Sequence, residues 1–309
     1  MDGLGRLLNR DPSAIDNSRR SASGTCVESP EACAAVAVGN AKPVTAIRKW
    51  SWPYRTNAMI QSLMGYAGFK RQCLSRTGPA TAGASSTSAE EELNRLTSGH
   101  PGNHVYRIVN KRVVPGFKLY ERLRLVTGVY PEPLQSFLDI GCCRGFYVLD
   151  AALRFHCPRA VGIDVYEPYV SAAQRAGKYL ETPNASFHLA SLEDVSNDPE
   201  RFGGPFRVVL LIGTYHYLFW GSDACSTAYR SHDEILRRLS RVCADMLIFS
   251  GRTTMKTLPR HVKSKLDGTE SDIPYTTEAF LQSAEKLFHV RHAGYLGTYP
   301  LLVMTKKHS

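Results

Sequence analysis

The sequence predicts an α/β fold, a doubly wound and mostly parallel seven-stranded sheet that ends in an antiparallel hairpin, with a largely disordered N-terminal extension. Over residues 136–309, short apolar runs typical of strands alternate with segments of helical spacing. This alternation is typical of a parallel sheet covered by helices on both faces. The last two runs are separated only by Gly297-Thr-Tyr-Pro300, which fits a hairpin.

Each expected element rests on its own apolar pattern. The strands are expected over residues 136–142, 160–165, 185–190, 206–213, 246–250, 290–295 and 301–305. Helices are expected between the strands over residues 146–155, 167–181, 231–244 and 277–287, and before the first strand over residues 90–96 and 113–126.

The chain divides into three parts. Residues 1–89 form a basic, low-complexity extension that ends in the small-residue segment TGPATAGASSTSA, which resembles a flexible linker. Residues 90–135 are expected to form a helical N-terminal segment of the core. Residues 136–309 form the domain in which we expect the functional site.

Composition excludes several classes of protein. Hydrophobic residues make up 43% of the chain and charged residues 21%, so a packed core is expected and disorder of the whole chain is excluded. No apolar run reaches the length of a membrane span, because Gly213, Thr214 and His216 interrupt the richest stretch. The eight cysteines form neither a Cys-x-x-Cys pair nor a Cys/His quartet, so we expect no metal, reduced thiols and a cytoplasmic location. Whether an organellar targeting segment is present stays open.

The net charge of +10 favours an anionic partner. Residues 32–89 contain no acid and contribute +7. Within them, residues 48–55 (RKWSWPYR) interleave cations with aromatic rings, a composition suited to RNA or to a membrane interface. The alternative is a short hook that packs against the core.

A candidate cofactor site follows the first expected strand, in the turn Asp139-Ile-Gly141-Cys-Cys-Arg-Gly145. Glycines in the first strand-to-helix turn allow the backbone to approach a ligand at the carboxyl edge of the sheet. Asp164 ends the second strand, while Ser191-Leu-Glu-Asp194 follows the third and Gly213 ends the fourth. A nicotinamide dinucleotide is disfavoured, because its fingerprint needs small residues where this chain has Cys143 and Phe146.

This order of motifs, with the terminal hairpin, resembles the class I S-adenosylmethionine-dependent methyltransferases, which have a Rossmann-like fold. The resemblance covers about residues 113–309 and implies that residues 136–309 bind S-adenosyl-L-methionine. It implies that Gly141, Cys142 and Gly145 lie under the methionine tail, with Cys143 in place of a middle glycine. The implied set of cofactor-binding residues is Asp139, Gly141, Cys142, Gly145, Asp164, Ser191, Leu192, Glu193 and Gly213.

Within that set, the resemblance assigns Asp164 to the ribose hydroxyls. Ser191 stands where an acid often binds the adenine amino group, so the adenine is expected to contact backbone groups near Leu192, or Glu193 or Asp194. Asp139 is expected to hydrogen-bond the glycine turn rather than to contact the cofactor. Arg144 could contact the methionine carboxylate or remain a solvated cation. Packing is the favoured interpretation of the Cys142-Cys143 pair.

The implied function is methyl transfer to a small-molecule acceptor. His216 is the candidate general base, and Tyr215 is a candidate wall of the catalytic site. Residues 113–127, 221–229 and the basic segment 252–274 are expected to enclose the acceptor, and the basic residues suit an anionic one. A tRNA or other RNA methyltransferase and a catalytically silent binding protein are the alternatives.

Overall fold

A computed structural model describes residues 64–71, 88–99, 101–102, 104–266 and 272–308. All of them belong to one compact unit, Trp50–Ser309. The basic-aromatic segment 48–55 and most of the extension expected to be disordered lie outside the described residues.

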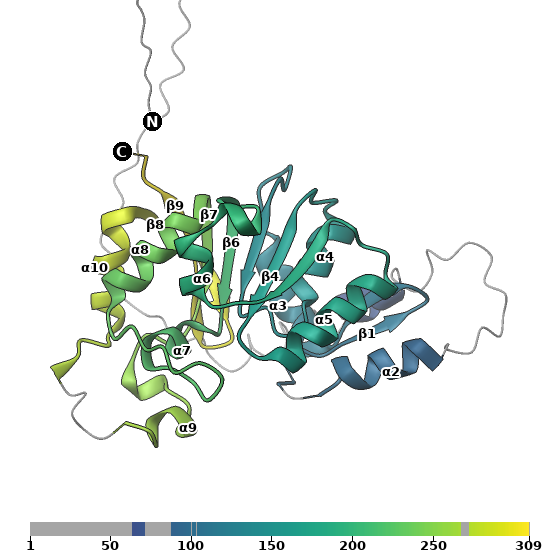
Figure 1. The fold of residues 1–309 in the computed structure, drawn as a ribbon, viewed down its shortest axis with the longest axis horizontal. Coiled ribbons are helices and arrows are strands. Elements are labelled where there is room, and N and C mark those ends of the chain that lie inside the picture. Colours follow the sequence, from purple (N-terminus) through teal and green to yellow (C-terminus); the bar gives the residue numbers. More distant parts are fainter. Residues whose placement is uncertain (1–63, 72–87, 100, 103, 267–271, 309) are drawn as a thin grey trace, which may run out of the picture. The chain divides into compact units, whose positions relative to one another are not determined.

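The central sheet has seven strands in the spatial order β5-β4-β3-β6-β7-β9-β8 (Figure 1). The strands are β3 (Phe137–Ile140), β4 (Ala160–Asp164), β5 (Ala185–Leu189), β6 (Phe206–Ile212), β7 (Cys243–Ser250), β8 (Phe288–Leu296) and β9 (Tyr299–Lys306). The first five are parallel, whereas β9 runs antiparallel to both β7 and β8. The predicted fold class is therefore confirmed.

Helices cover both faces of the sheet. They are α2 (Ser88–Thr97), α3 (Phe117–Thr127), α4 (Phe146–Arg154), α5 (Glu167–Tyr179), α6 (Leu192–Asn197), α7 (Tyr215–Trp220), α8 (His232–Val242), α9 (Arg260–Lys263) and α10 (Thr277–Leu287). Alternate residues of one strand supply the two cores: Val208 and Leu210 pack with α3, α4 and α5, while Val209 and Leu211 pack with α6, α7, α8 and α10. This two-residue period is what a strand buried on both faces requires.

A two-stranded hairpin precedes the main sheet, where a helix was expected from residue 113. Strands β1 (Tyr106–Val109) and β2 (Arg112–Pro115) pair antiparallel through the two-residue turn Asn110-Lys111. Both turn residues have positive φ, 52° and 54°, as the tight hairpin turns that match strand twist require. The expected helix is real but starts four residues later, at Phe117.

Residues 64–71 are helical, although they fall in the extension that was expected to be disordered. The Tyr66 hydroxyl donates a hydrogen bond to the Pro115 carbonyl at 3.1 Å. The rings of Tyr66 and Phe69 lie 5.3 and 5.0 Å from the ring of Tyr120 on α3. This segment therefore contributes packed aromatic surface to the core beside α3.

Candidate functional site

A cavity of about 1510 Å³ opens at the carboxyl ends of the parallel strands. Its wall includes residues that follow β3, β4, β5, β6 and β7, together with parts of α3, α9 and the β8–β9 turn. The strand order reverses between β3 and β6, because β4 and β5 lie on one side and β7 on the other. Ligands of open α/β sheets bind at this kind of reversal.

Both turn glycines after β3 occupy positions that no larger residue fits. Gly141 lines the cavity with φ +74°, and a Cβ there would lie 2.3 Å from Thr214 Oγ1. Gly145 starts α4 with φ +79°, and a Cβ there would lie 2.4 Å from Phe187 Cε1. Gly141 therefore brings backbone to the cavity wall, whereas Gly145 lets α4 pack closely against its neighbours.

Cys143 takes the middle position of the turn, with φ +51°, and lines the cavity. Burial raises the pKa of its thiol to about 12. Cys142 is buried below the turn against Gly162 and does not line the cavity. Its Sγ donates a hydrogen bond to the Cys143 carbonyl at 3.7 Å.

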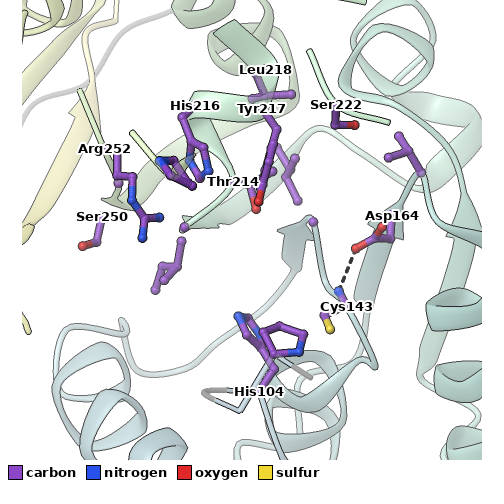
Figure 2. A pocket seen from close by; sticks show the side chains of 18 of the residues that line it. His104, Cys143, Asp164, Thr214, His216, Tyr217, Leu218, Ser222, Ser250 and Arg252 are labelled. Atoms are coloured by element: carbon purple, nitrogen blue, oxygen red, sulfur yellow. Dashed lines mark hydrogen bonds between the residues drawn. The ribbon is translucent and has the colours of Figure 1, made fainter. Parts of the chain in front are cut away.

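Asp164 joins the ends of β3 and β4 (Figure 2). Its Oδ2 accepts a hydrogen bond from the Cys143 N–H at 2.9 Å, and its Oδ1 accepts one from the Tyr166 N–H at 3.0 Å. Burial raises the carboxyl pKa, while these backbone donors oppose the rise. The carboxylate thus faces the cavity in a fixed orientation.

Asp139 lies behind this arrangement, is buried and does not line the cavity. Burial, with the neighbouring charge of Asp164, raises the pKa of Asp139 to about 8. Its side chain makes no hydrogen bond to the glycine turn within the described part of the chain, so the expected mode of support is absent there.

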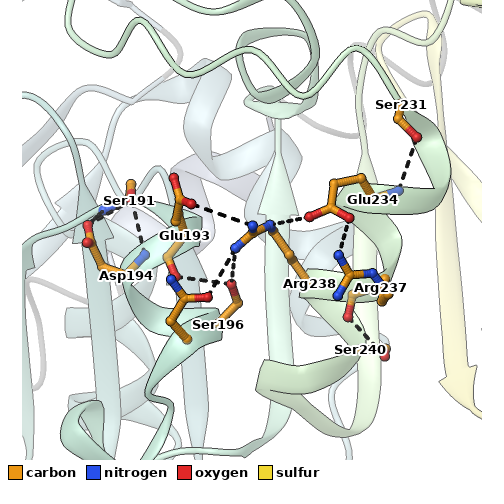
Figure 3. Close-up of polar contacts among 10 residues, drawn as sticks. Ser191, Glu193, Asp194, Ser196, Ser231, Glu234, Arg237, Arg238 and Ser240 are labelled. Carbon is orange, nitrogen blue, oxygen red and sulfur yellow. Dashed lines mark hydrogen bonds and ion pairs between the residues drawn. The ribbon is translucent and has the colours of Figure 1, made fainter.

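The three cofactor residues expected in the segment after β5 do not all lie at the cavity. Ser191 and Leu192 line the cavity, but Glu193 does not. The Ser191 hydroxyl caps α6 by accepting from the Asp194 N–H at 3.2 Å, and Asp194 Oδ2 accepts from the Ser191 N–H at 2.8 Å. Glu193 instead faces α8, where it pairs with Arg238 at 3.5 Å (Figure 3).

Tyr215 and His216 begin α7 and point to different environments. Tyr215 has no exposed surface and does not line the cavity. Its hydroxyl is hydrogen-bonded to His232 Nδ1, and its ring packs edge-on against Phe249 and Phe280. This placement does not support Tyr215 as a wall of the catalytic site, because a helix, unlike the expected strand end, turns adjacent side chains about 100° apart.

His216 lines the cavity although only 1% of the residue is exposed. Among the residues that the structure describes, neither ring nitrogen finds a hydrogen-bond partner. Burial, followed by the charges of Arg252 and His261, lowers its pKa to about 3, so the imidazole is neutral at physiological pH.

Other residues of the cavity wall also have buried polar atoms without a hydrogen bond. Within the described part of the chain, Arg122 Nη1, Trp220 Nε1 and Arg252 Nε are such atoms. Buried polar atoms are normally paired, so an unpaired group in a cavity wall is a marker of ligand contact. Arg122 lies within residues 113–127, which were expected to enclose the acceptor, but no motif singles out Arg122 or Trp220. Only the packing of α3 and α7 turns these two side chains toward the cavity.

Arg144 fits neither role that the sequence left open. The residue is 7% exposed, its guanidinium lies 4.7 Å from the centre of the Tyr169 ring, and the side chain does not line the cavity. Arg144 is therefore not a solvated loop cation. Arg122 instead lies near Gly213 at the end of β6, where its Nη2 is 4.0 Å from a Cβ placed on the glycine.

The described residues contain no group of three or more His, Cys, Asp or Glu side chains able to hold a metal ion. No helix among them combines the length and apolarity that crossing a bilayer requires.

Residues 137–240 match the family model of a methyltransferase domain. Fold and match together define this region as a methyltransferase domain of the class I, Rossmann-like kind. Comparison with curated proteins gave no match.

Several solved structures share the fold at low identity. The bifunctional kinase-methyltransferase WbdD is 18% identical with a TM-score of 0.48, over 70% of this chain and 46% of that one. PH0226 from Pyrococcus horikoshii OT3 is 14% identical with a TM-score of 0.45, over 65% and 95% of the two chains. A putative S-adenosylmethionine-dependent methyltransferase from Listeria monocytogenes is 16% identical with a TM-score of 0.41, over 60% and 98%. This chain covers less than half of the WbdD chains.

Proposed function

We propose that the cavity binds S-adenosyl-L-methionine and that the protein transfers its methyl group to a small-molecule acceptor. The observation that carries the proposal is Asp164, a carboxylate fixed at the end of β4, bonded to the glycine turn of β3 and open to the cavity. It lies within the segment that matches a methyltransferase domain.

The cavity residues fit the parts of this cofactor. Each Asp164 oxygen accepts one backbone hydrogen bond and has a further lone pair for a ribose hydroxyl. Ser191 and Leu192 suit the adenine, and the backbone at Gly141 and Gly213 suits the methionine portion. Arg122, with its unpartnered Nη1, suits the methionine carboxylate.

Charge also favours a cationic cofactor over a dinucleotide. The Asp164 carboxylate is hydrogen-bonded to the glycine turn and raises the electrostatic cost of any anion there, whereas Asp139, with a pKa of about 8, is largely protonated at neutral pH and adds little charge. A pyrophosphate at the glycine turn would meet that cost. A sulfonium and an ammonium group would instead be stabilised.

When bound, the cofactor would supply a methyl group on a sulfonium, whose carbon an aligned nucleophile can attack with the thioether S-adenosylhomocysteine as the leaving group. The protein's part is to align the acceptor and to exclude water. His216 is neutral and has no hydrogen-bond partner among the described residues, so it can accept a hydrogen bond from an acceptor hydroxyl or amine. A pKa of about 3 makes the imidazole a weak base, so proton removal requires the bound acceptor to raise that pKa.

Calorimetry with S-adenosylmethionine, S-adenosylhomocysteine and NAD tests the cofactor assignment. We expect the first two to bind and NAD to give no heat. Absence of binding by both sulfur compounds, or tight binding of NAD, would refute the assignment.

Methyl transfer is tested separately with methyl-labelled cofactor and fractionated cell extract. Label in a small-molecule fraction is the expected result. Label in RNA would support the RNA alternative, and binding without transfer to any fraction would support a silent binding protein.

A further inference from the structure

We propose that the methyl acceptor carries an oxyanion, a carboxylate or a phosphate, which Arg252 binds beside His216. This inference rests on the proposed function and names the substrate class of the same site.

Arg252 is held in place but its charge is not paired. It follows β7, and its backbone carbonyl accepts a hydrogen bond from the Tyr275 hydroxyl. Its guanidinium lies 5.0 Å from the centre of the Tyr299 ring. Nε is buried without a hydrogen-bond partner, and no ion pair of Arg252 occurs among the residues that the structure describes.

This arrangement leaves the guanidinium ready for an anion. A cation over an aromatic face keeps its N–H groups available in the plane of the guanidinium, where a carboxylate or phosphate can accept two of them. A half-buried charge without a counter-ion is costly, and an anionic ligand would remove that cost. Lys265, another cation of the cavity wall, already pairs with Asp223.

The position of Arg252 assigns it to the acceptor rather than to the cofactor. Arg252 and His216 lie side by side across the cavity from Asp164 (Figure 2). The lowering of the His216 pKa by Arg252 reports the same proximity. A cofactor that reaches from Asp164 to the glycine turn leaves this opposite side for the second substrate.

The volume of the cavity and the residues around Arg252 favour a small-molecule acceptor. A pocket for one drug-sized ligand has roughly 300–1,000 Å³, so about 1510 Å³ can hold a cofactor and a second compound. Tyr217, His261 and Tyr299 line the cavity near Arg252 and suit an apolar or aromatic body on the acceptor. RNA phosphates would be met by exposed cations, whereas Arg252 Nε is buried.

The test uses full-length protein saturated with S-adenosylhomocysteine, so that the cofactor's own carboxylate site is filled. Calorimetry then measures the affinity of this complex for benzoate and for phenyl phosphate, with benzamide as the neutral counterpart of benzoate. Wild type is compared with R252Q, which removes the charge, and R252K, which keeps it without the planar fork. K256Q is the matched control, because Lys256 is an exposed cation of the same segment that does not line the cavity.

We expect the better anion to bind wild type at least tenfold more tightly than benzamide does. R252Q should reduce that preference to less than threefold, R252K should give an intermediate value, and K256Q should leave it unchanged. Affinity for S-adenosylhomocysteine should stay the same in all variants, which also shows that they are folded.

Several results would overturn the inference: no preference for the anions in wild type, a preference retained in R252Q, or an equal loss in K256Q. Binding of tRNA that depends on Arg252 would overturn it in favour of an RNA acceptor. Failure of wild type to bind S-adenosylhomocysteine would instead refute the proposed function on which the inference rests.

Discussion

Replacing Asp164 with Ala tests both the proposed ribose contact and the turn that presents it. The change removes the acceptor of two backbone hydrogen bonds, from Cys143 at 2.9 Å and from Tyr166 at 3.0 Å. It also removes the acceptor proposed for two ribose hydroxyls. The variant should therefore lose stability and cofactor affinity by separable amounts.

The magnitudes follow from the number of contacts. Hydrogen bonds to charged groups contribute about 1.5–3 kcal/mol each. Two lost ribose contacts could reach about 3–6 kcal/mol, and water that replaces part of them makes a loss of at least tenfold the minimum expected result. The unfolding free energy should fall by about 1–3 kcal/mol, because burial already penalises the charged carboxyl and its removal returns part of that cost.

Calorimetry for S-adenosylmethionine and urea unfolding without ligand measure the two effects. Asp150→Asn is the matched control, because Asp150 is a buried carboxylate paired with Arg154 on α4 and does not line the cavity. It should lower stability and leave cofactor affinity within threefold of wild type. Unchanged affinity in folded Asp164→Ala would refute the ribose assignment.

Three other predictions concern the turn, the imidazole and the buried acid. Gly145→Ala should lower the free energy of unfolding by about 2–5 kcal/mol in urea, because it adds left-handed backbone strain to a 2.4 Å clash with Phe187. Gly297→Ala is the control, because its φ of +67° and open surroundings leave only the backbone strain. Equal losses of stability in the two variants would contradict the clash. His216→Ala should lower turnover about 10²–10⁴-fold, with S-adenosylhomocysteine affinity unchanged; near-normal turnover would leave alignment as the whole mechanism. Because the folded pKa of Asp139 is about 8 against 3.8, its stabilising contribution is complete below pH 3.8 and is lost as pH rises through 8. Wild type should therefore lose stability relative to Asp139→Asn between pH 5 and 7.5, by up to about 1.4 kcal/mol per pH unit, and a pH-independent difference in unfolding free energy would contradict the assigned pKa.

The order of residues along the chain was enough to predict the sheet. Buried strands need continuous apolar runs and the helices between them need a 3.6-residue period, so both are visible in the order of residues. Gly141, Gly145 and Asp164 were also predictable as a group, because the carboxyl ends of parallel strands meet at one edge. The positive φ angles of Gly141 and Gly145, and the hydrogen bond from the glycine turn to the Asp164 carboxylate, agree with that placement.

The side of α7 that meets the cavity depends on how this helix packs against the sheet. Tyr215 and His216 are neighbours in the chain, yet Tyr215 packs in the core while His216 faces the cavity, because helical geometry separates adjacent side chains and the sheet buries one of the two directions. The same holds for Glu193, which is turned toward Arg238 of α8. Arg122 and Arg252 are 130 residues apart by number. Their segments, 113–127 and 252–274, were expected around one site, but which of their side chains enter the cavity wall depends on how α3 and the end of β7 meet at the edge of the sheet.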